Sequence, residues 1–93
     1  MIITKTPFRI SFAGGGSDLE KFYSKSPGAV LSSTINKFMY ISTHRFWDEE
    51  IIVAKYSKTE IVKSLSQMNH PIIKEVLKQF NVSGALEISS NAD

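Results

Sequence analysis

The chain has 93 residues, of which 42% are hydrophobic and 22% are charged, and its formal net charge is +2. This composition predicts one small folded domain and excludes a disordered chain. Basic residues form no block, apolar runs are far shorter than a membrane span, and cysteine is absent. These features argue against nucleic-acid binding, a transmembrane protein and a disulfide framework. Because the N-terminus has no signal-peptide anatomy, we expect a cytoplasmic protein.

The first third of the chain predicts two strands and a helix around three consecutive glycines. Residues 2–5 form a short strand, and Pro7 requires an extended residue before it. Residues 8–13 alternate between apolar and polar side chains, which is the period of a half-buried strand. The pattern Ser17-x-x-Glu20 is typical of a capping box and predicts a helix that ends near residues 26–28.

The middle of the chain predicts a strand, a hairpin connection and a returning strand. Residues 29–43 are rich in β-branched and aromatic side chains, which favours a long strand, bent near residues 32–36. We expect residues 45–50 to form the connection, with the acids at 48–50 at a solvated tip, and residues 51–56 to return alongside.

Two amphipathic helices and a final strand are predicted in the last third. Thr59 would cap the first helix, whose apolar stripe consists of Ile61, Val62, Leu65 and Met68. Asn69 and Pro71 would start the second, whose stripe consists of Ile72, Ile73, Val76, Leu77 and Phe80. The second helix would end at residues 81–84, and residues 86–89 would form a strand that gives way to a loop.

This order of elements predicts an α+β fold, with helices on one face of a mainly antiparallel sheet. We expect the two apolar stripes to pack on a sheet face that includes Phe8, Ile10 and Phe12.

The run Gly14, Gly15, Gly16, Ser17 and Asp18 is the main candidate site. Its backbone amides, at the start of a helix, would donate hydrogen bonds to ligand oxygens. The alternative is a tight turn that needs a positive φ. No Gly-Lys-Ser/Thr follows, so the run is not a nucleotide phosphate loop, and the acid at Asp18 favours a neutral polyol.

Asp18 and Arg9 each have two interpretations. Asp18 either accepts hydrogen bonds from ligand hydroxyls or offsets the helix dipole as a first-turn acid. Arg9 either holds a phosphate and stabilises charge in a transition state, or pairs with a carboxylate on the sheet surface. His44 and His70 are isolated in the sequence and predict no metal site, and Lys37 is expected to face solvent.

Residues 7–19 (PFRISFAGGGSDL) resemble the N-terminal signature of the GHMP kinase superfamily. Within it they are most similar to the sugar-1-kinase branch that contains the D-glycero-D-manno-heptose 7-phosphate kinases. Residues 28–38, 56–60 and 70–77 are also similar to that branch, so the resemblance extends over essentially all 93 residues.

The resemblance implies an N-terminal domain like the second domain of ribosomal protein S5, followed by a ferredoxin-like domain. It implies ATP and Mg²⁺ as cofactors and transfer of the γ-phosphoryl group to the anomeric oxygen of a sugar. Arg9 would lie near the transferred phosphoryl group or the sugar phosphate, and Gly14 to Asp18 would line the sugar pocket. The expected partner is a small-molecule sugar or sugar phosphate, not a nucleic acid or a membrane, and a homo-oligomer is also allowed.

In that family the phosphate loop follows a strand like residues 86–93, so residues 1–93 correspond to an incomplete N-terminal kinase domain. The nucleotide loop, a later catalytic acid and the second domain would lie beyond Asp93. Two alternatives stay open: another sugar kinase of the fucose or galactose type, and a binding module for a sugar or phosphate without catalysis.

Overall fold

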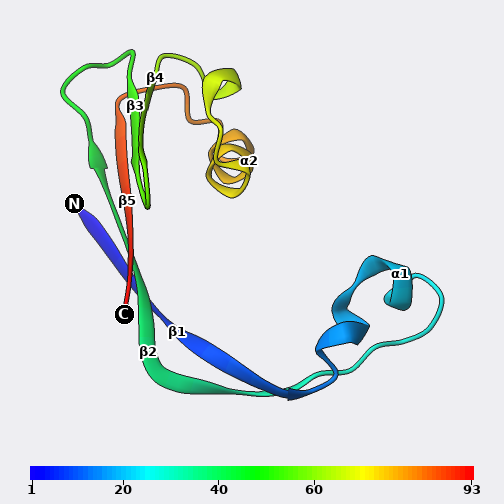
Figure 1. The fold of residues 1–93 in the computed structure, drawn as a ribbon. Coiled ribbons are helices and arrows are strands. Elements are labelled where there is room, and N and C mark those ends of the chain that lie inside the picture. Colours follow the sequence, from blue (N-terminus) through cyan, green and yellow to red (C-terminus); the bar gives the residue numbers. More distant parts are fainter. The chain divides into compact units, whose positions relative to one another are not determined.

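The computed structural model describes all 93 residues and contains five strands and two α-helices (Figure 1). The strands are β1 (Ile2–Ala13), β2 (Leu31–Arg45), β3 (Ile52–Lys55), β4 (Thr59–Val62) and β5 (Leu86–Ala92). The helices are α1 (Glu20–Tyr23) and α2 (Pro71–Gln79), preceded by the short 3-10 helices η1 (Gly15–Asp18) and η2 (Leu65–Gln67).

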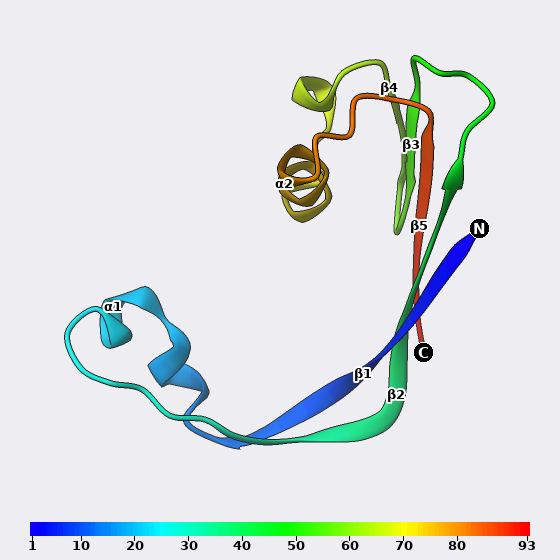
Figure 2. The ribbon, with the colours of Figure 1, turned by 180° about the vertical axis from the view of Figure 1, so that it is seen from behind.

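The strands form one sheet in the order β1-β2-β5-β3-β4. β5 runs antiparallel to β2 and parallel to β3, and β4 runs antiparallel to β3. The parallel β3–β5 pair needs a crossover, which β4 and α2 provide. The front and back views both show α2 to one side of β3 and β5 (Figure 2). The predicted α+β class with a mainly antiparallel sheet is therefore confirmed.

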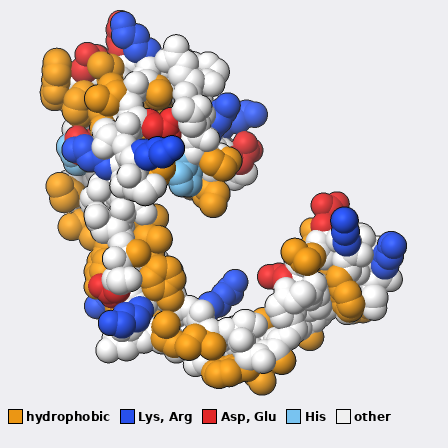
Figure 3. All heavy atoms as spheres, viewed as in Figure 1, with side chains coloured by type: hydrophobic (Ala, Val, Ile, Leu, Met, Phe, Trp, Pro, Cys, Tyr) orange, Lys and Arg blue, Asp and Glu red, His pale blue; other side chains and the backbone are white.

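The chain divides into two compact units. The first unit comprises residues 1–5 and 39–92, and the second unit comprises residues 6–38 together with Asp93. Every buried hydrophobic residue belongs to the first unit. The space-filling view shows further hydrophobic side chains on the surface of both units (Figure 3), and the exposed ones include Phe12 at 66% and Trp47 at 83%.

The core of the first unit lies between α2, η2 and the strands β3, β4 and β5. Its buried members are Ile52, Ala54, Val62, Met68 and Leu77, with Leu65, Ile73, Val82, Leu86 and Ile88 packed around them. Ile52 and Ala54 are two residues apart on β3 and therefore share one face of the sheet. The N-terminus of α2 is capped by His70, whose Nδ1 accepts a hydrogen bond from the Ile73 N–H, and Pro71 stands in the first turn.

The predicted break between the first two strands is wrong, because β1 runs without interruption from Ile2 to Ala13 through Pro7. β1 is at the edge of the sheet, with β2 as its neighbour. An edge strand tolerates a proline, since the missing N–H can face away from the partner strand.

The predicted hairpin between residues 29–43 and 51–56 is also wrong. β2 and β3 are not neighbours, because β5 lies between them and pairs with both. The returning strand instead forms its hairpin with β4, where the Tyr56 N–H donates to the Lys58 carbonyl at 2.8 Å. The local sequence of β2 and β3 does not indicate that β5, which comes much later in the chain, will pair between them.

The helix predicted from Thr59 is replaced by β4 and η2. Val62 is buried whereas its neighbour Ile61 is 66% exposed, which is the alternation of an edge strand. Pairing with β3 provides hydrogen-bond partners for the backbone of β4 along one side. This tertiary interaction outweighs the helix preference that the spacing of the apolar residues indicates.

The second predicted helix is confirmed as α2, although its apolar stripe is divided. Leu77 is buried and Ile73 packs against the core, while Ile72 is 69% and Phe80 is 77% exposed. The core cluster contains none of Phe8, Ile10 and Phe12, which belong to the second unit, so the expected packing against them stays a prediction. The last strand continues through Ala92 instead of ending at Ser89, because residues 90–92 pair with β2.

Candidate functional site

Residues 14–18 form a turn, called the glycine turn below. Its first residue, Gly14, has a left-handed conformation with φ of +87°. A Cβ atom at this position would collide with the carbonyl oxygen of Ala29. Both constraints require glycine, so the structural interpretation of a positive-φ turn holds at Gly14. At Gly16, by contrast, a Cβ atom would meet no atom within 4 Å.

The Ser17 hydroxyl links the two ends of the loop that contains η1 and α1. It lies 2.7 Å from the Gly14 carbonyl oxygen and 3.0 Å from that of Ala29, and it accepts from the Ala29 N–H at 3.1 Å. The predicted capping box is wrong, because α1 begins after Leu19 and has no side-chain cap. Since the Ser17 oxygen is occupied by these contacts, its role is to hold the turn closed.

Arg9, Gly15 and Asp18 line one hollow within the second unit, together with Ser11, Val30 and Ser32. The hollow has a volume of about 460 Å³. Arg9 and Ser11 share a face of β1 because they are two residues apart, and η1 brings Gly15 and Asp18 to the same place. The predicted residues Gly14, Gly16 and Ser17 do not line it.

The two charged groups of the hollow are exposed and unpaired. The ion pairs of the structure join His44 and Lys55 to Glu87, and Arg45 to Glu49, and none includes Arg9 or Asp18. The surface ion pair considered for Arg9 is therefore not formed. A guanidinium ion can bind a phosphate through two parallel hydrogen bonds, and a carboxylate accepts from hydroxyl groups. The arrangement suits a ligand that carries both an anion and hydroxyl groups.

The hollow does not suit a magnesium-bound nucleotide. No three His, Cys, Asp or Glu side chains gather closely enough to hold a metal ion. The hollow has one carboxylate, Asp18, for its one cation, Arg9, so its lining carries no net positive charge to balance a triphosphate. The lining of this hollow therefore does not fit ATP and Mg²⁺.

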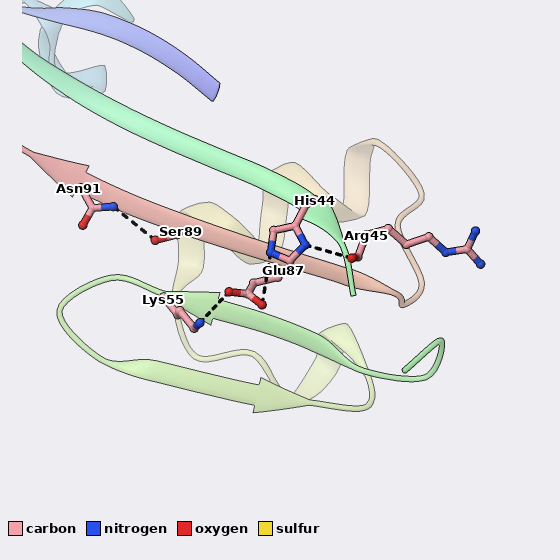
Figure 4. Close-up of polar contacts among 6 residues, drawn as sticks. All are labelled: His44, Arg45, Lys55, Glu87, Ser89 and Asn91. Atoms are coloured by element: carbon pink, nitrogen blue, oxygen red, sulfur yellow. Dashed lines mark hydrogen bonds and ion pairs between the residues drawn. The ribbon is translucent and has the colours of Figure 1, made fainter. Parts of the chain in front are cut away.

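A second polar cluster lies on the sheet of the first unit, where Glu87 stands between His44 and Lys55 (Figure 4). The Lys55 Nζ is 2.6 Å from one carboxylate oxygen, and the His44 Nε2 is 3.4 Å from the other. The hydrogen bond from Lys55 is the main reason that the pKa of Glu87 is lowered. No partner for His44 could be predicted from the sequence, because only the insertion of β5 between β2 and β3 brings these three residues together. Their cross-strand pairing supports the sheet.

Glu60 is a second carboxylate that sequence analysis did not single out. It accepts hydrogen bonds from the Asn69 N–H at 2.8 Å, the His70 N–H at 3.2 Å and the Tyr56 hydroxyl at 2.8 Å. The bond from Asn69 is the main cause of the lowered pKa of Glu60, and the bond to Glu60 raises the pKa of Tyr56. This carboxylate joins β4 to the start of α2 and has a structural role.

The fold matches the crystal structure of a D-glycero-D-manno-heptose 1-phosphate kinase from Bacteroides thetaiotaomicron, with a TM-score of 0.73 and 20% identity. The match covers 98% of this chain and 33% of that one. In sequence, the chain is 37% identical over 51 residues to the D-glycero-alpha-D-manno-heptose 7-phosphate kinase of Campylobacter jejuni. That alignment covers 55% of this chain and 15% of the relative.

No protein-family model matches the chain. The two relatives nevertheless agree in class, and the chain resembles a sugar kinase of the GHMP type over a part of such a protein's length. Both relatives are heptose phosphate kinases by name. None of the helices has the length and apolar character that crossing a membrane requires.

Proposed function

We propose that residues 1–93 form the N-terminal, sugar-binding part of an ATP-dependent sugar kinase. Its reaction would place a phosphoryl group on the anomeric hydroxyl of a sugar or sugar phosphate, foremost D-glycero-D-manno-heptose 7-phosphate. The observation that carries this proposal is the hollow in which the unpaired Arg9 and Asp18 meet the glycine turn. The resemblance to the two heptose phosphate kinases supports it.

The residues of the glycine turn would divide into two groups. Asp18 would accept hydrogen bonds from ring hydroxyls, and the Gly15 backbone borders the same space. Gly14 and Ser17 would act indirectly, by fixing the conformation that presents Asp18. Arg9 would neutralise a phosphate, either the one carried by the sugar or the one being transferred.

ATP and Mg²⁺ would be bound by residues that follow Asp93. The family's second domain would also lie after Asp93. ATP supplies the phosphoryl group, and the enzyme's contribution to such a reaction is mainly positioning and charge stabilisation. Residues 1–93 would orient the sugar acceptor only. We therefore expect the 93-residue chain by itself to transfer no phosphate.

The test is an assay of ADP release with D-glycero-D-manno-heptose 7-phosphate, ATP and Mg²⁺. It compares the 93-residue chain with the complete protein encoded by the same gene. We expect sugar-dependent turnover by the complete protein and none by the 93-residue chain. Equal turnover by both would contradict the proposed division of the site. A complete protein that binds the sugar phosphate but releases no ADP would instead favour the non-catalytic binding module.

The position of the phosphate on the substrate needs its own comparison, because the two relatives are named for a 7-phosphate and a 1-phosphate. The complete protein would be assayed with heptose 7-phosphate, heptose 1-phosphate, fucose and galactose in parallel. A preference for heptose 7-phosphate is expected. A preference for fucose or galactose would support the other branch of sugar kinases.

A further inference from the structure

We infer that Ser11, Ser32 and Val30 determine which sugar ring the hollow accepts. This inference rests on the proposed function, because it concerns the same hollow. It adds a ligand class: a cyclic sugar phosphate with an apolar ring face and free hydroxyl groups at its edge.

Ser11 belongs to β1, Ser32 belongs to β2, and Val30 directly precedes β2. Ser11 follows Arg9 by two residues on β1, so both belong to the same face of that strand. Val30, just before β2, and Ser32, the second residue of β2, are also two residues apart, and both line the hollow. Ser33, between Ser32 and Thr34, does not line it, and its hydroxyl donates to the Thr34 carbonyl at 3.2 Å.

The two serine hydroxyls of the hollow have little bonding within the protein. Ser32 makes no hydrogen bond through its side chain, and the contact of Ser11 with the Ala13 carbonyl is long, at 3.5 Å. A serine hydroxyl both donates and accepts, so it can match a sugar hydroxyl in either sense. Ser11 and Ser32 are therefore available to a ligand in a way that Ser17, held by Gly14 and Ala29, is not.

Val30 supplies the apolar part of the same surface. Its side chain is 47% exposed although it belongs to a hydrophobic residue. A pyranose ring has a face of C–H groups, which packs against such a side chain while its hydroxyls reach polar neighbours. Inorganic phosphate would be held chiefly by the charge of Arg9, and it has no C–H face that could pack against Val30.

The experiment measures binding by calorimetry to the complete encoded protein, with heptose 7-phosphate and inorganic phosphate as the two probes. We expect Ser11→Ala and Ser32→Ala each to weaken binding of the sugar phosphate roughly 2- to 12-fold, the range for one hydrogen bond. Binding of inorganic phosphate, which depends chiefly on the charge of Arg9, should weaken less than binding of the sugar phosphate. The matched control Ser33→Ala should bind both probes like the wild type, and Ser32→Thr, which keeps a hydroxyl, should restore most of the affinity.

Binding of different sugar analogues distinguishes a serine that contacts the sugar from a serine that only supports the fold. Deoxy analogues of the sugar phosphate, each lacking one hydroxyl, should bind the wild type more weakly. For the hydroxyl that Ser32 contacts, this preference should disappear in Ser32→Ala. A loss of fold would lower the affinity for every analogue alike. If the wild type binds all deoxy analogues equally, the inference is overturned even where a serine variant is unstable.

The outcomes also separate this inference from the proposed function. If the serine variants bind normally while Asp18→Asn is weakened, the serines are not specificity residues and the sugar site stands. If the wild type binds no sugar phosphate at all, the proposed function itself is contradicted. Val30→Ala should weaken sugar phosphate binding without altering phosphate binding, and an equal effect on both probes would contradict its role as an apolar wall.

Discussion

The two units of this chain are held together by different interactions. In the first unit, residues from β3, β4, η2 and α2 form an apolar core with Ile52 and Ala54 completely buried. The second unit has no buried hydrophobic residue, and its turn depends on the conformation of Gly14 and on the hydrogen bonds of Ser17. The candidate site lies in the unit without a core.

The two units should respond differently to mutation. Burial of apolar surface is the main source of stability in the first unit, whereas a few local contacts fix the conformation of the second. Segments with few buried contacts open at lower free energy than core elements. A substitution in the core should therefore change global unfolding, and a substitution in the turn should change ligand binding and local exchange.

The largest effect is expected for Leu77→Ala in the core of the first unit. Leu77 is 5% exposed, and its truncation should lower the free energy of unfolding by about 2–5 kcal/mol. Urea denaturation followed by circular dichroism measures this loss. Ile72→Ala on the same helix is the control, because Ile72 is 69% exposed and should change stability by about 0.5 kcal/mol at most. Similar losses for the two variants would contradict the assigned core.

Gly14→Ala should disturb the second unit. The new Cβ would meet the Ala29 carbonyl at a positive φ, at a cost of about 1–3 kcal/mol. Hydrogen exchange should speed up in residues 14–30 while the amides of β3 and β5 keep their protection. Gly16→Ala is the control, since its Cβ would enter open space. Uniform loss of protection across both units would show that they do not respond separately.

Asp18→Asn tests the site without removing its side chain. Loss of a charged acceptor to a sugar hydroxyl should cost about 1.5–3 kcal/mol, or roughly one to two decades in kcat/KM for the sugar in the complete kinase. The KM for ATP should change little. Glu20→Gln is the matched control, because Glu20 is an exposed acid near η1 that does not line the hollow. Normal sugar kinetics with reduced stability would make Asp18 a first-turn acid and nothing more.

The smallest effect is expected in the pH dependence of the first unit. The pKa of Glu60 is lowered by its hydrogen bonds, chiefly the one from Asn69. The carboxylate therefore binds fewer protons in the folded than in the unfolded chain. Its contribution is present above the unfolded pKa and is lost as the pH falls through the folded value.

Urea denaturation between about pH 7 and about pH 3 measures this dependence. Glu60→Gln should flatten the acid side of the stability profile, because the titrating group is gone. Glu75→Gln is the control, since Glu75 is exposed on α2 and makes no ion pair. An unchanged profile in Glu60→Gln would mean that other carboxylates dominate the acid response.

Local sequence predicted the features of the chain that depend on neighbouring residues. Pro71 and the apolar spacing behind it predicted α2, and the alternation from Phe8 to Ala13 predicted the second half of β1. A turn that needs a positive φ was the alternative interpretation of the three glycines, and Gly14 has such a φ. In the candidate site, Arg9, Gly15 and Asp18 lie within ten residues of one another, so their proximity follows from one strand and one turn.

Tertiary structure decided the features that depend on distant residues. β5 pairs between β2 and β3, which removes the predicted hairpin and creates the Glu87 cluster. Residues 59–62 form β4 because pairing with β3 satisfies their backbone, although their spacing also fits a helix. Val30 and Ser32 line the hollow although they follow α1 in the chain. Strand pairing of this kind depends on backbone hydrogen-bonding groups, so side-chain patterns alone do not determine which strands become neighbours.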